Sequence, residues 1–246
     1  SYNNYNDIFS ALTISKSLPN KSGTVIVKHA NPCGVSVHKN NLKSYQLALA
    51  CDPISAFGGI VSCNFKITKK LATELNNIFL EVVIANGFDK DAMQILKKKK
   101  NLRLIDATNF IMKNFLKFGS VNESILVQSE DLKKFDIKDF KIVSKKKPNK
   151  SQLKSLIFAF NVCRYVKSNA IVLASEDTTV GIGSGQPSRL DSCQIAIDKM
   201  NKFQNLKEEI VAASDAFFPF VDGIEKLVQS GISAVIQPSG SIRDKE

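Results

Sequence analysis

The chain has 246 residues, of which 43% are hydrophobic and 23% are charged, a composition typical of globular proteins. No apolar run approaches the roughly 20 residues needed to span a bilayer, so we expect no membrane partner. The net charge of +11 comes mostly from Lys, without Arg-aromatic interleaving or an RNP, zinc-finger or helix-turn-helix pattern, so we expect no nucleic-acid partner. The five cysteines form no CxxC pair, which favours reduced thiols and a cytoplasmic location.

Short apolar runs alternate with helical patterns along the chain. The runs predict strands at 24–27, 60–64, 82–85, 102–105, 125–128, 170–174, 179–182, 210–213 and 234–237. The helical patterns predict helices at 68–79, 89–99, 152–165, 188–203 and 222–229. This alternation is typical of an α/β fold with a largely parallel or mixed sheet.

The segment 144–150 is the best candidate for a boundary inside the chain. It combines a run of Lys with Pro148, which neither a strand nor a helix interior tolerates, and a new helical pattern follows it. We therefore predict two α/β units, residues 1–147 and 148–246.

The first predicted strand ends in Lys28 and His29, and the sequence Asn-Pro-Cys-Gly at 31–34 predicts a turn directly after them. Strand ends are where a rigid sheet presents side chains to a cleft, which suits catalysis. Taken alone, such a pair is more often solvated surface than a functional site. Cys33 beside His29 resembles a thiol nucleophile pair, but we interpret Cys33 as a packing residue.

Two further segments have the residue types of a ligand site. The Gly-rich stretch 181–189 lies between a strand and a helix, where backbone can approach a ligand closely. It is neither a dinucleotide fingerprint, because Gln186 occupies the third Gly position, nor a P-loop. The stretch 214–223 has three Phe around a Pro with Asp at both sides. It suits either a flat aromatic ligand with polar edges or a plug in the core.

The sequence lacks the motifs of two other enzyme classes, the zinc deaminases and the serine hydrolases. Zinc deaminases need His-x-Glu and Pro-Cys-x-x-Cys, whereas here Ala30 and Asn31 follow His29 and no second Cys follows Cys33. With only two histidines in the chain, we expect no zinc. The stretch around Ser184 does not match the Gly-x-Ser-x-Gly elbow of serine hydrolases.

Taken together, the motifs resemble those of the bacterial AICAR transformylase family. Six of them occur in the family's order from end to end of the chain, at 28–34, 52–59, 167–170, 181–189, 214–222 and 237–244. The resemblance implies two cytidine-deaminase-like, three-layer α/β/α subdomains with mixed sheets. It also implies a homodimer with active sites at the subunit interface. The implied reaction transfers a formyl group from 10-formyltetrahydrofolate to the 5-amino group of AICAR ribotide in IMP biosynthesis.

The resemblance also assigns roles to single residues. His29 is the implied general base, Lys28 the implied oxyanion stabiliser or acid, and Asn169 an amide donor to the formyl oxygen or an orienter of His29. Phe57, Gly58 and Glu81 fall where the family contacts AICAR ribotide. The folate pocket is implied at Ile54, Ile182, Phe217, Pro219, Phe220 and Asp222, and a monovalent cation, K⁺, at Asp215.

The sequence also departs from the family pattern. Val221 stands where Arg is frequent, and Asn86 replaces a common Pro, differences expected to change ligand affinity without abolishing the chemistry. Family members also carry an IMP cyclohydrolase domain before such a stretch and further residues after it. We therefore interpret the sequence as an internal part of a bifunctional enzyme, weakly active or inactive on its own. The alternatives are a non-catalytic folate- or nucleotide-binding fragment, a basic nucleic-acid-binding protein and a metal-dependent deaminase.

Overall fold

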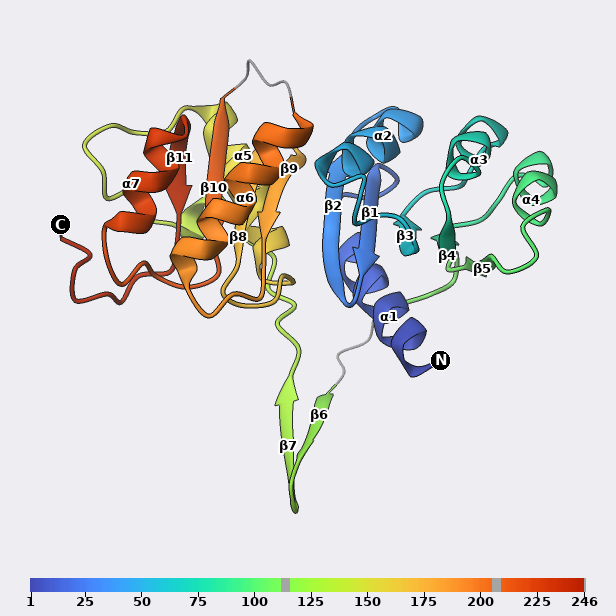
Figure 1. Ribbon diagram of the computed structural model, residues 1–246, viewed down its shortest axis with the longest axis horizontal. Helices are drawn as coiled ribbons and strands as arrows, with labels where there is room; N and C mark the ends of the chain where they lie inside the picture. The colour runs from blue at the N-terminus through green and yellow to red at the C-terminus, as the bar shows by residue number, and fades with distance from the viewer. Residues whose placement is uncertain (112–115, 205–208, 246) are drawn as a thin grey trace.

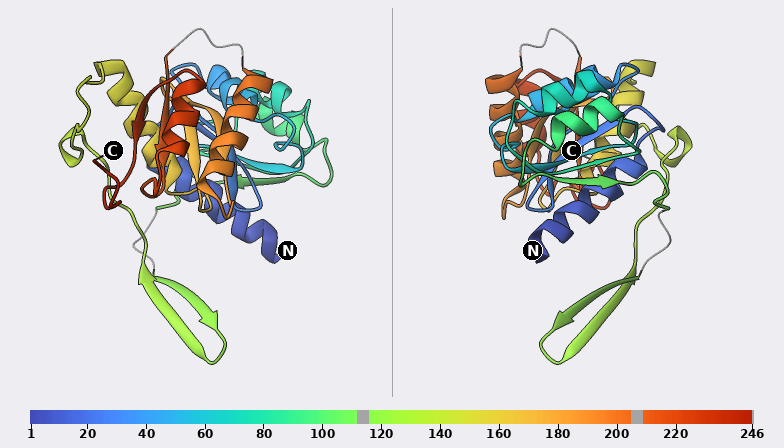
Figure 2. Two further views of the ribbon diagram at one scale, coloured as in Figure 1. Left: turned by 60° about the vertical axis from the view of Figure 1, so that its left-hand side comes forward. Right: turned by 90° about the vertical axis from the view of Figure 1, so that its right-hand side faces the viewer.

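A computed structural model describes residues 1–111, 116–204 and 209–245 of the chain. Within these residues, one nine-stranded mixed sheet has the order β11-β10-β8-β9-β2-β1-β3-β4-β5 (Figure 1). Its strands are β1 (Gly23–Lys28), β2 (Asn31–Val37), β3 (Gly59–Cys63), β4 (Leu80–Ala85), β5 (Arg103–Asp106), β8 (Ile171–Ser175), β9 (Thr178–Gly183), β10 (Ile210–Ser214) and β11 (Ile232–Ile236). A separate hairpin, β6 (Leu116–Val121) and β7 (Ser124–Ser129), projects from the body (Figures 1 and 2).

Helices cover both faces of the sheet, so the expected three-layer α/β/α architecture is confirmed. On one face, α1 (Tyr2–Ser17) and α5 (Lys150–Cys163) share a single apolar core with the sheet. On the other, α2 (Asn41–Cys51), α3 (Lys69–Leu75) and α4 (Lys90–Leu96) pack on β1, β3 and β4, while α6 (Arg189–Phe203) and α7 (Asp222–Gln229) pack on β8 and β10. Among the described helices, none is both long and apolar enough to cross a bilayer.

The order of elements is repeated in the two halves of the chain. The series α1-β1-β2-α2-β3-α3-β4 matches α5-β8-β9-α6-β10-α7-β11. In each series the first strand pairs antiparallel with the second and third, and the third pairs parallel with the fourth. Strands from both halves join one sheet through the pair Ser36↔Thr178. The division at 147/148 and the cytidine-deaminase likeness stay predictions.

The packing of each hairpin against a helix depends on glycine. A Cβ on Gly34 would lie 1.9 Å from the carbonyl oxygen of Ala48, and a Cβ on Gly183 would lie 1.9 Å from that of Ser192. No side chain fits at such distances, because the opposing atoms belong to the backbone. The two glycines therefore let α2 and α6 lie directly on β2 and β9.

The structure corrects the predicted turn at 31–34. The chain reverses two residues earlier, at His29 and Ala30, and Asn31–Val37 is the strand β2. Pro and Gly gave the turn signal, but Pro32 pairs with Val27 at a register shift and Gly34 serves helix packing.

Several elements were not expected from the sequence, and several expected bounds shift. Helices α1 and α2 and strand β6 are additional. Helix α2 has a polar signal at its start, since the Asn40 side chain accepts a hydrogen bond from the Lys43 amide at 3.1 Å. The predicted helices at 68–79 and 89–99 are shorter, at Lys69–Leu75 and Lys90–Leu96. The other predicted helices and the predicted strands are found within a few residues of their expected bounds.

Candidate active site

The turn between β1 and β2 presents the two residues predicted to be catalytic. Lys28 is the last residue of β1, and the exposed His29 is the first residue of the turn. Both turn residues, His29 and Ala30, have positive φ, at 54° and 58°. The turn is fixed from outside by Asp7 of α1, which accepts hydrogen bonds from both turn amides.

The residues predicted to bind AICAR ribotide lie around the ammonium of Lys28. Lys28 Nζ donates a hydrogen bond to the carbonyl oxygen of Phe57 at 2.7 Å. The next residue, Gly58, has φ of +74° and donates its amide to the Phe79 carbonyl at 2.9 Å. The rings of Phe57 and Phe79 lie 5.3 Å apart. The structure thus brings Lys28, Phe57 and Gly58 together at the start of β4.

Glu81, on β4, lies near the same strand end. Its carboxylate accepts a hydrogen bond from the Asn4 side chain of α1 at 2.9 Å. Helix α1 therefore contacts both the β1–β2 turn, through Asp7, and Glu81, the residue predicted to bind substrate, through Asn4. No sequence pattern had pointed to this helix.

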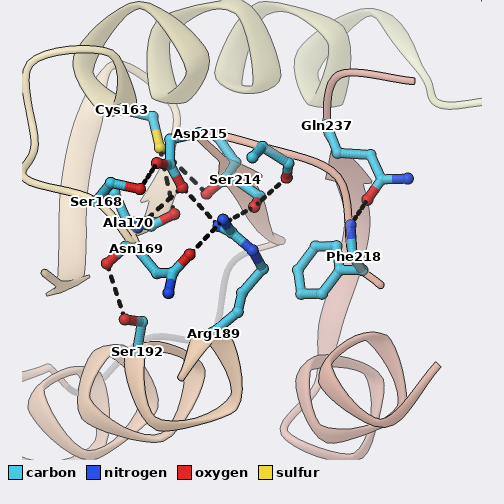
Figure 3. A network of polar contacts seen from close by, with 12 residues as sticks. Cys163, Ser168, Asn169, Ala170, Arg189, Ser192, Ser214, Asp215, Phe218 and Gln237 are labelled. Atoms are coloured by element: carbon cyan, nitrogen blue, oxygen red, sulfur yellow. Dashed lines mark hydrogen bonds and ion pairs between the residues drawn. The ribbon is translucent and has the colours of Figure 1, made fainter. Parts of the chain in front are cut away.

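A second polar cluster is centred on Arg189, the first residue of α6 (Figure 3). Its guanidinium donates to the Asn169 amide oxygen at 2.6 Å, to the Ser214 hydroxyl at 2.8 Å and to the Asp215 carboxylate at 2.5 Å. The Asn169 amide group donates to the carbonyls of Gln186 and Pro187, at 2.8 and 2.9 Å. Both ends of the Asn169 side chain are therefore bound within the protein.

The position of Asp215 follows from the antiparallel pairing of β8 and β10, which places Ser214 opposite Ile171. Its carboxylate accepts hydrogen bonds from Arg189, from the Ala170 amide at 2.9 Å and from the Ser168 hydroxyl. Burial raises the pKa of Asp215, but these donors bind the ionised form and hold the pKa below its ordinary value. The carboxylate predicted to bind K⁺ thus neutralises an arginine, and its cation role stays a prediction.

A cavity of about 550 Å³ opens beside this cluster. Five residues predicted from the sequence line it together: Asn169, Phe217, Pro219, Phe220 and Asp222. Arg189 lies in its wall, 5.9 Å from the centre of the Phe218 ring. The cavity therefore combines an aromatic wall with a cation and a carboxylate.

Two residues predicted for the folate pocket lie elsewhere. Ile182, on β9, is 3% exposed and packs in the core shared by α1 and α5. Ile54 is 62% exposed in the loop between α2 and β3. Neither lines the cavity, and their contact with a ligand stays a prediction.

The side chain of Asn31 connects the two clusters. It accepts a hydrogen bond from the Lys167 amide at 2.9 Å and donates to the His29 carbonyl at 3.4 Å. The loop before Asn169 is thereby attached to the turn that carries His29.

Cysteine chemistry does not fit this site. The five cysteines are buried thiols without disulfides. Burial raises the pKa of Cys33 to about 12, so its thiol stays protonated at neutral pH. This agrees with the interpretation of Cys33 as a packing residue. In the described part of the chain, no three His, Cys, Asp or Glu side chains are grouped as metal ligands would be.

Sequence reasoning missed Asp7 and Arg189 as single residues. Arg189 ends the Gly-rich motif and follows the helix cap Ser188, so a charged side chain at a helix start was the available signal. Asp7 had no such signal, because its partners lie 22 and 23 residues away in the chain.

Comparison with known proteins agrees with these motifs. The profile of the family described as AICARFT/IMPCHase bienzyme matches residues 1–199. Proteins named bifunctional purine biosynthesis protein PurH are similar over the whole chain, with 44% identity in Persephonella marina, 43% in Acetivibrio thermocellus and 42% in Aquifex aeolicus. The match covers 48% of each of these relatives, so the chain spans about half their length.

Proposed function

Because the chain belongs to the AICARFT/IMPCHase bienzyme family, we propose that it supplies the formyltransferase activity of a bifunctional enzyme of purine biosynthesis. The substrates are AICAR ribotide and 10-formyltetrahydrofolate, and the products are formyl-AICAR ribotide and tetrahydrofolate. We assign IMP cyclohydrolase activity to the part of the relatives that the chain does not match. The observation that carries the proposal is the position of Lys28 and His29 at a hairpin tip beside Phe57 and Gly58.

The chemistry of the transfer accounts for this pair. The amine nitrogen attacks the formyl carbon, the carbonyl oxygen becomes an oxyanion, and the bond from carbon to the folate nitrogen then breaks. His29 takes the proton that the amine loses, because an imidazole exchanges protons near neutral pH. The ammonium of Lys28 stabilises the oxyanion or gives a proton to the departing nitrogen.

The cavity beside Arg189 is our candidate for the folate site. Its wall of Phe217, Pro219 and Phe220 suits the flat pterin ring, and the Asp222 carboxylate suits the N–H donors on the edge of that ring. Arg189 belongs to the same wall and holds Asn169 by its amide oxygen. We therefore place AICAR ribotide near Lys28 and the folate near Arg189.

Direct assay of formyl transfer tests the proposal. The full-length protein that contains this chain is expected to convert AICAR ribotide and 10-formyltetrahydrofolate, which absorbance of tetrahydrofolate formation follows. Tight folate binding without turnover would favour the alternative, a non-catalytic binding module. Transfer at the same rate after removal of metal by a chelator is expected if no zinc takes part.

A homodimer is the second part of the proposal, supported by the hairpin β6–β7. Six of its apolar side chains are more than half exposed, at Leu116, Phe118, Val121, Ile125, Leu126 and Val127. A lone two-stranded hairpin is marginally stable in water, and exposed apolar patches mark contact surfaces. We propose that a second copy of the chain covers this hairpin and that the active sites lie at the interface.

Charge on the hairpin is expected to abolish the dimer. The double variant Phe118→Asp, Ile125→Asp should sediment as a monomer where the wild type sediments as a dimer, because the apolar contact area would carry unpaired carboxylates. Val143→Asp is the matched control, because it places the same charge at an exposed apolar residue outside the hairpin. A wild type that sediments as a monomer at micromolar concentration would contradict the proposed dimer.

A further inference from the structure

The turn that presents His29 has a backbone shape that its own residues do not favour. His29 and Ala30 both have positive φ, and the flanking residues Lys28 and Asn31 pair with each other. Two-residue hairpin turns with positive φ at both positions prefer Asn and Gly, because a Cβ is strained in this region. His and Ala therefore need support from outside the turn.

Asp7, on α1, provides this support. Its Oδ1 accepts a hydrogen bond from the Ala30 amide at 2.7 Å, and its Oδ2 accepts one from the His29 amide at 3.1 Å. Hydrogen bonds to a carboxylate are stronger than hydrogen bonds to a neutral acceptor, and the carboxylate has one oxygen for each of the two amides. One helical turn further on, the Ser10 hydroxyl donates to the Ala30 carbonyl at 3.0 Å. Helix α1 thus binds the turn at three backbone atoms.

The imidazole of His29 is not held by polar contacts among the described residues. The side chain is exposed, and within the described residues no group forms a hydrogen bond or ion pair with the ring. The φ and ψ of the turn, which Asp7 fixes, set the direction of the Cα–Cβ bond and so the region that the ring can reach. A change of these angles would move the ring, because the side chain rotates with its own backbone.

We propose that Asp7 is a positioning residue for His29: by binding both turn amides, its carboxylate holds the imidazole where the amine of AICAR ribotide loses its proton. This inference rests on the proposed formyltransferase function. It assigns to α1 a role in the rate of the chemical step, which neither the fold nor the catalytic motif had indicated.

Kinetics of Asp7 variants test the inference in the full-length protein. Asp7→Ala is expected to lower kcat by about 10- to 100-fold, the scale of effect of a misplaced catalytic group, with KM for the folate unchanged. Asp7→Asn keeps one accepting oxygen and should lose less. Asn6→Ala is the matched control, an exposed neighbour on the same helix. A kcat of Asp7→Ala equal to that of Asn6→Ala, with both folded, would overturn the inference.

Restoring the turn by another route should rescue the variant. Glycine adopts positive φ readily, so Ala30→Gly in the Asp7→Ala background is expected to recover part of kcat. If Asp7 served only to stabilise the fold, thermal stability would change in Asp7→Ala but kcat of the folded enzyme would not. Rescue of kcat by Ala30→Gly separates these two roles.

Hydrogen exchange of the His29 backbone amide measures how firmly the turn is held, and it does not depend on an activity assay. With ¹⁵N-histidine labelling, the His29 signal is assigned by its loss in His29→Ala, and His38 serves as the internal reference, since its amide binds the Ser22 carbonyl at 3.0 Å. We expect faster exchange at His29 alone in Asp7→Ala. Unchanged exchange in an active enzyme would overturn the inference by itself. A wild type that transfers no formyl group would overturn the proposed function and, with it, the catalytic role of Asp7.

Discussion

Replacing His29 with alanine is expected to lower kcat for formyl transfer by about 10²- to 10⁴-fold, the usual contribution of a general base. The imidazole is exposed at the tip of the β1–β2 hairpin, so its removal disturbs no packing. Lys28→Ala should lower kcat by a similar factor, because it removes the charge that stabilises the oxyanion. Steady-state kinetics with both substrates varied measure the two effects.

The chain contains its own controls for these variants. His38 is the second histidine, exposed after β2, and His38→Ala should leave kcat unchanged. Lys39→Ala is the matched control for Lys28→Ala, since Lys39 is exposed beside His38 in the loop after β2. Urea unfolding shows whether each variant is folded. If folded His29→Ala protein keeps the wild-type kcat, the proton is taken by another group and the assignment of His29 is wrong.

The β1–β2 hairpin shows how much of the structure the sequence predicts. The apolar run before Lys28 identified β1, and the polar pair at its end identified the strand end where we propose the site. The turn was misplaced because Pro32 and Gly34 are turn residues by type. In the structure, Gly34 is required by contact with α2, a reason that lies in tertiary packing.

The contacts of the Arg189 cluster join residues that are distant in sequence, and the sequence could not predict these contacts. Phe217 and Asp222, predicted for one folate pocket, line a cavity together with Asn169, which was predicted to be catalytic; Asn169 lies just before β8, and the other two lie after β10. The motif could not show that Arg189 binds the Asn169 oxygen. It also gave no sign that the halves of the chain repeat one order of elements, since different side chains fill equivalent positions in the two cores.

Arg189→Leu is expected to lower the free energy of unfolding by about 3 to 5 kcal/mol, the cost of leaving one partner of a buried ion pair alone. The side chains of Arg189 and Asp215 are only 9% and 16% exposed, so the charge that remains is poorly solvated. Lys66→Ala breaks the ion pair with Asp89, whose side chains are 61% and 39% exposed, and should cost less than about 1 kcal/mol. Urea unfolding monitored by circular dichroism measures both.

Removing both charges should be less harmful than removing one. In the double variant Arg189→Leu, Asp215→Leu, no buried charge is left unpaired, so we expect it to be more stable than either single variant. A double variant whose loss equals the sum of the single losses would show that the two charges act independently, contrary to the structure.

Acid provides a further test of the same pair. Because the pKa of Asp215 is lowered on folding, its ionised form stabilises the protein fully above about pH 4, and this stabilisation is lost as the pH falls through the lowered pKa. The stability difference between wild type and Asp215→Asn should therefore be constant near neutral pH and shrink in acid. A difference that grows in acid would mean that Asp215 is protonated beside Arg189. In that case Arg189 would still hold Asn169 by a charge-assisted hydrogen bond, and its charge would be free for an anionic group of the folate.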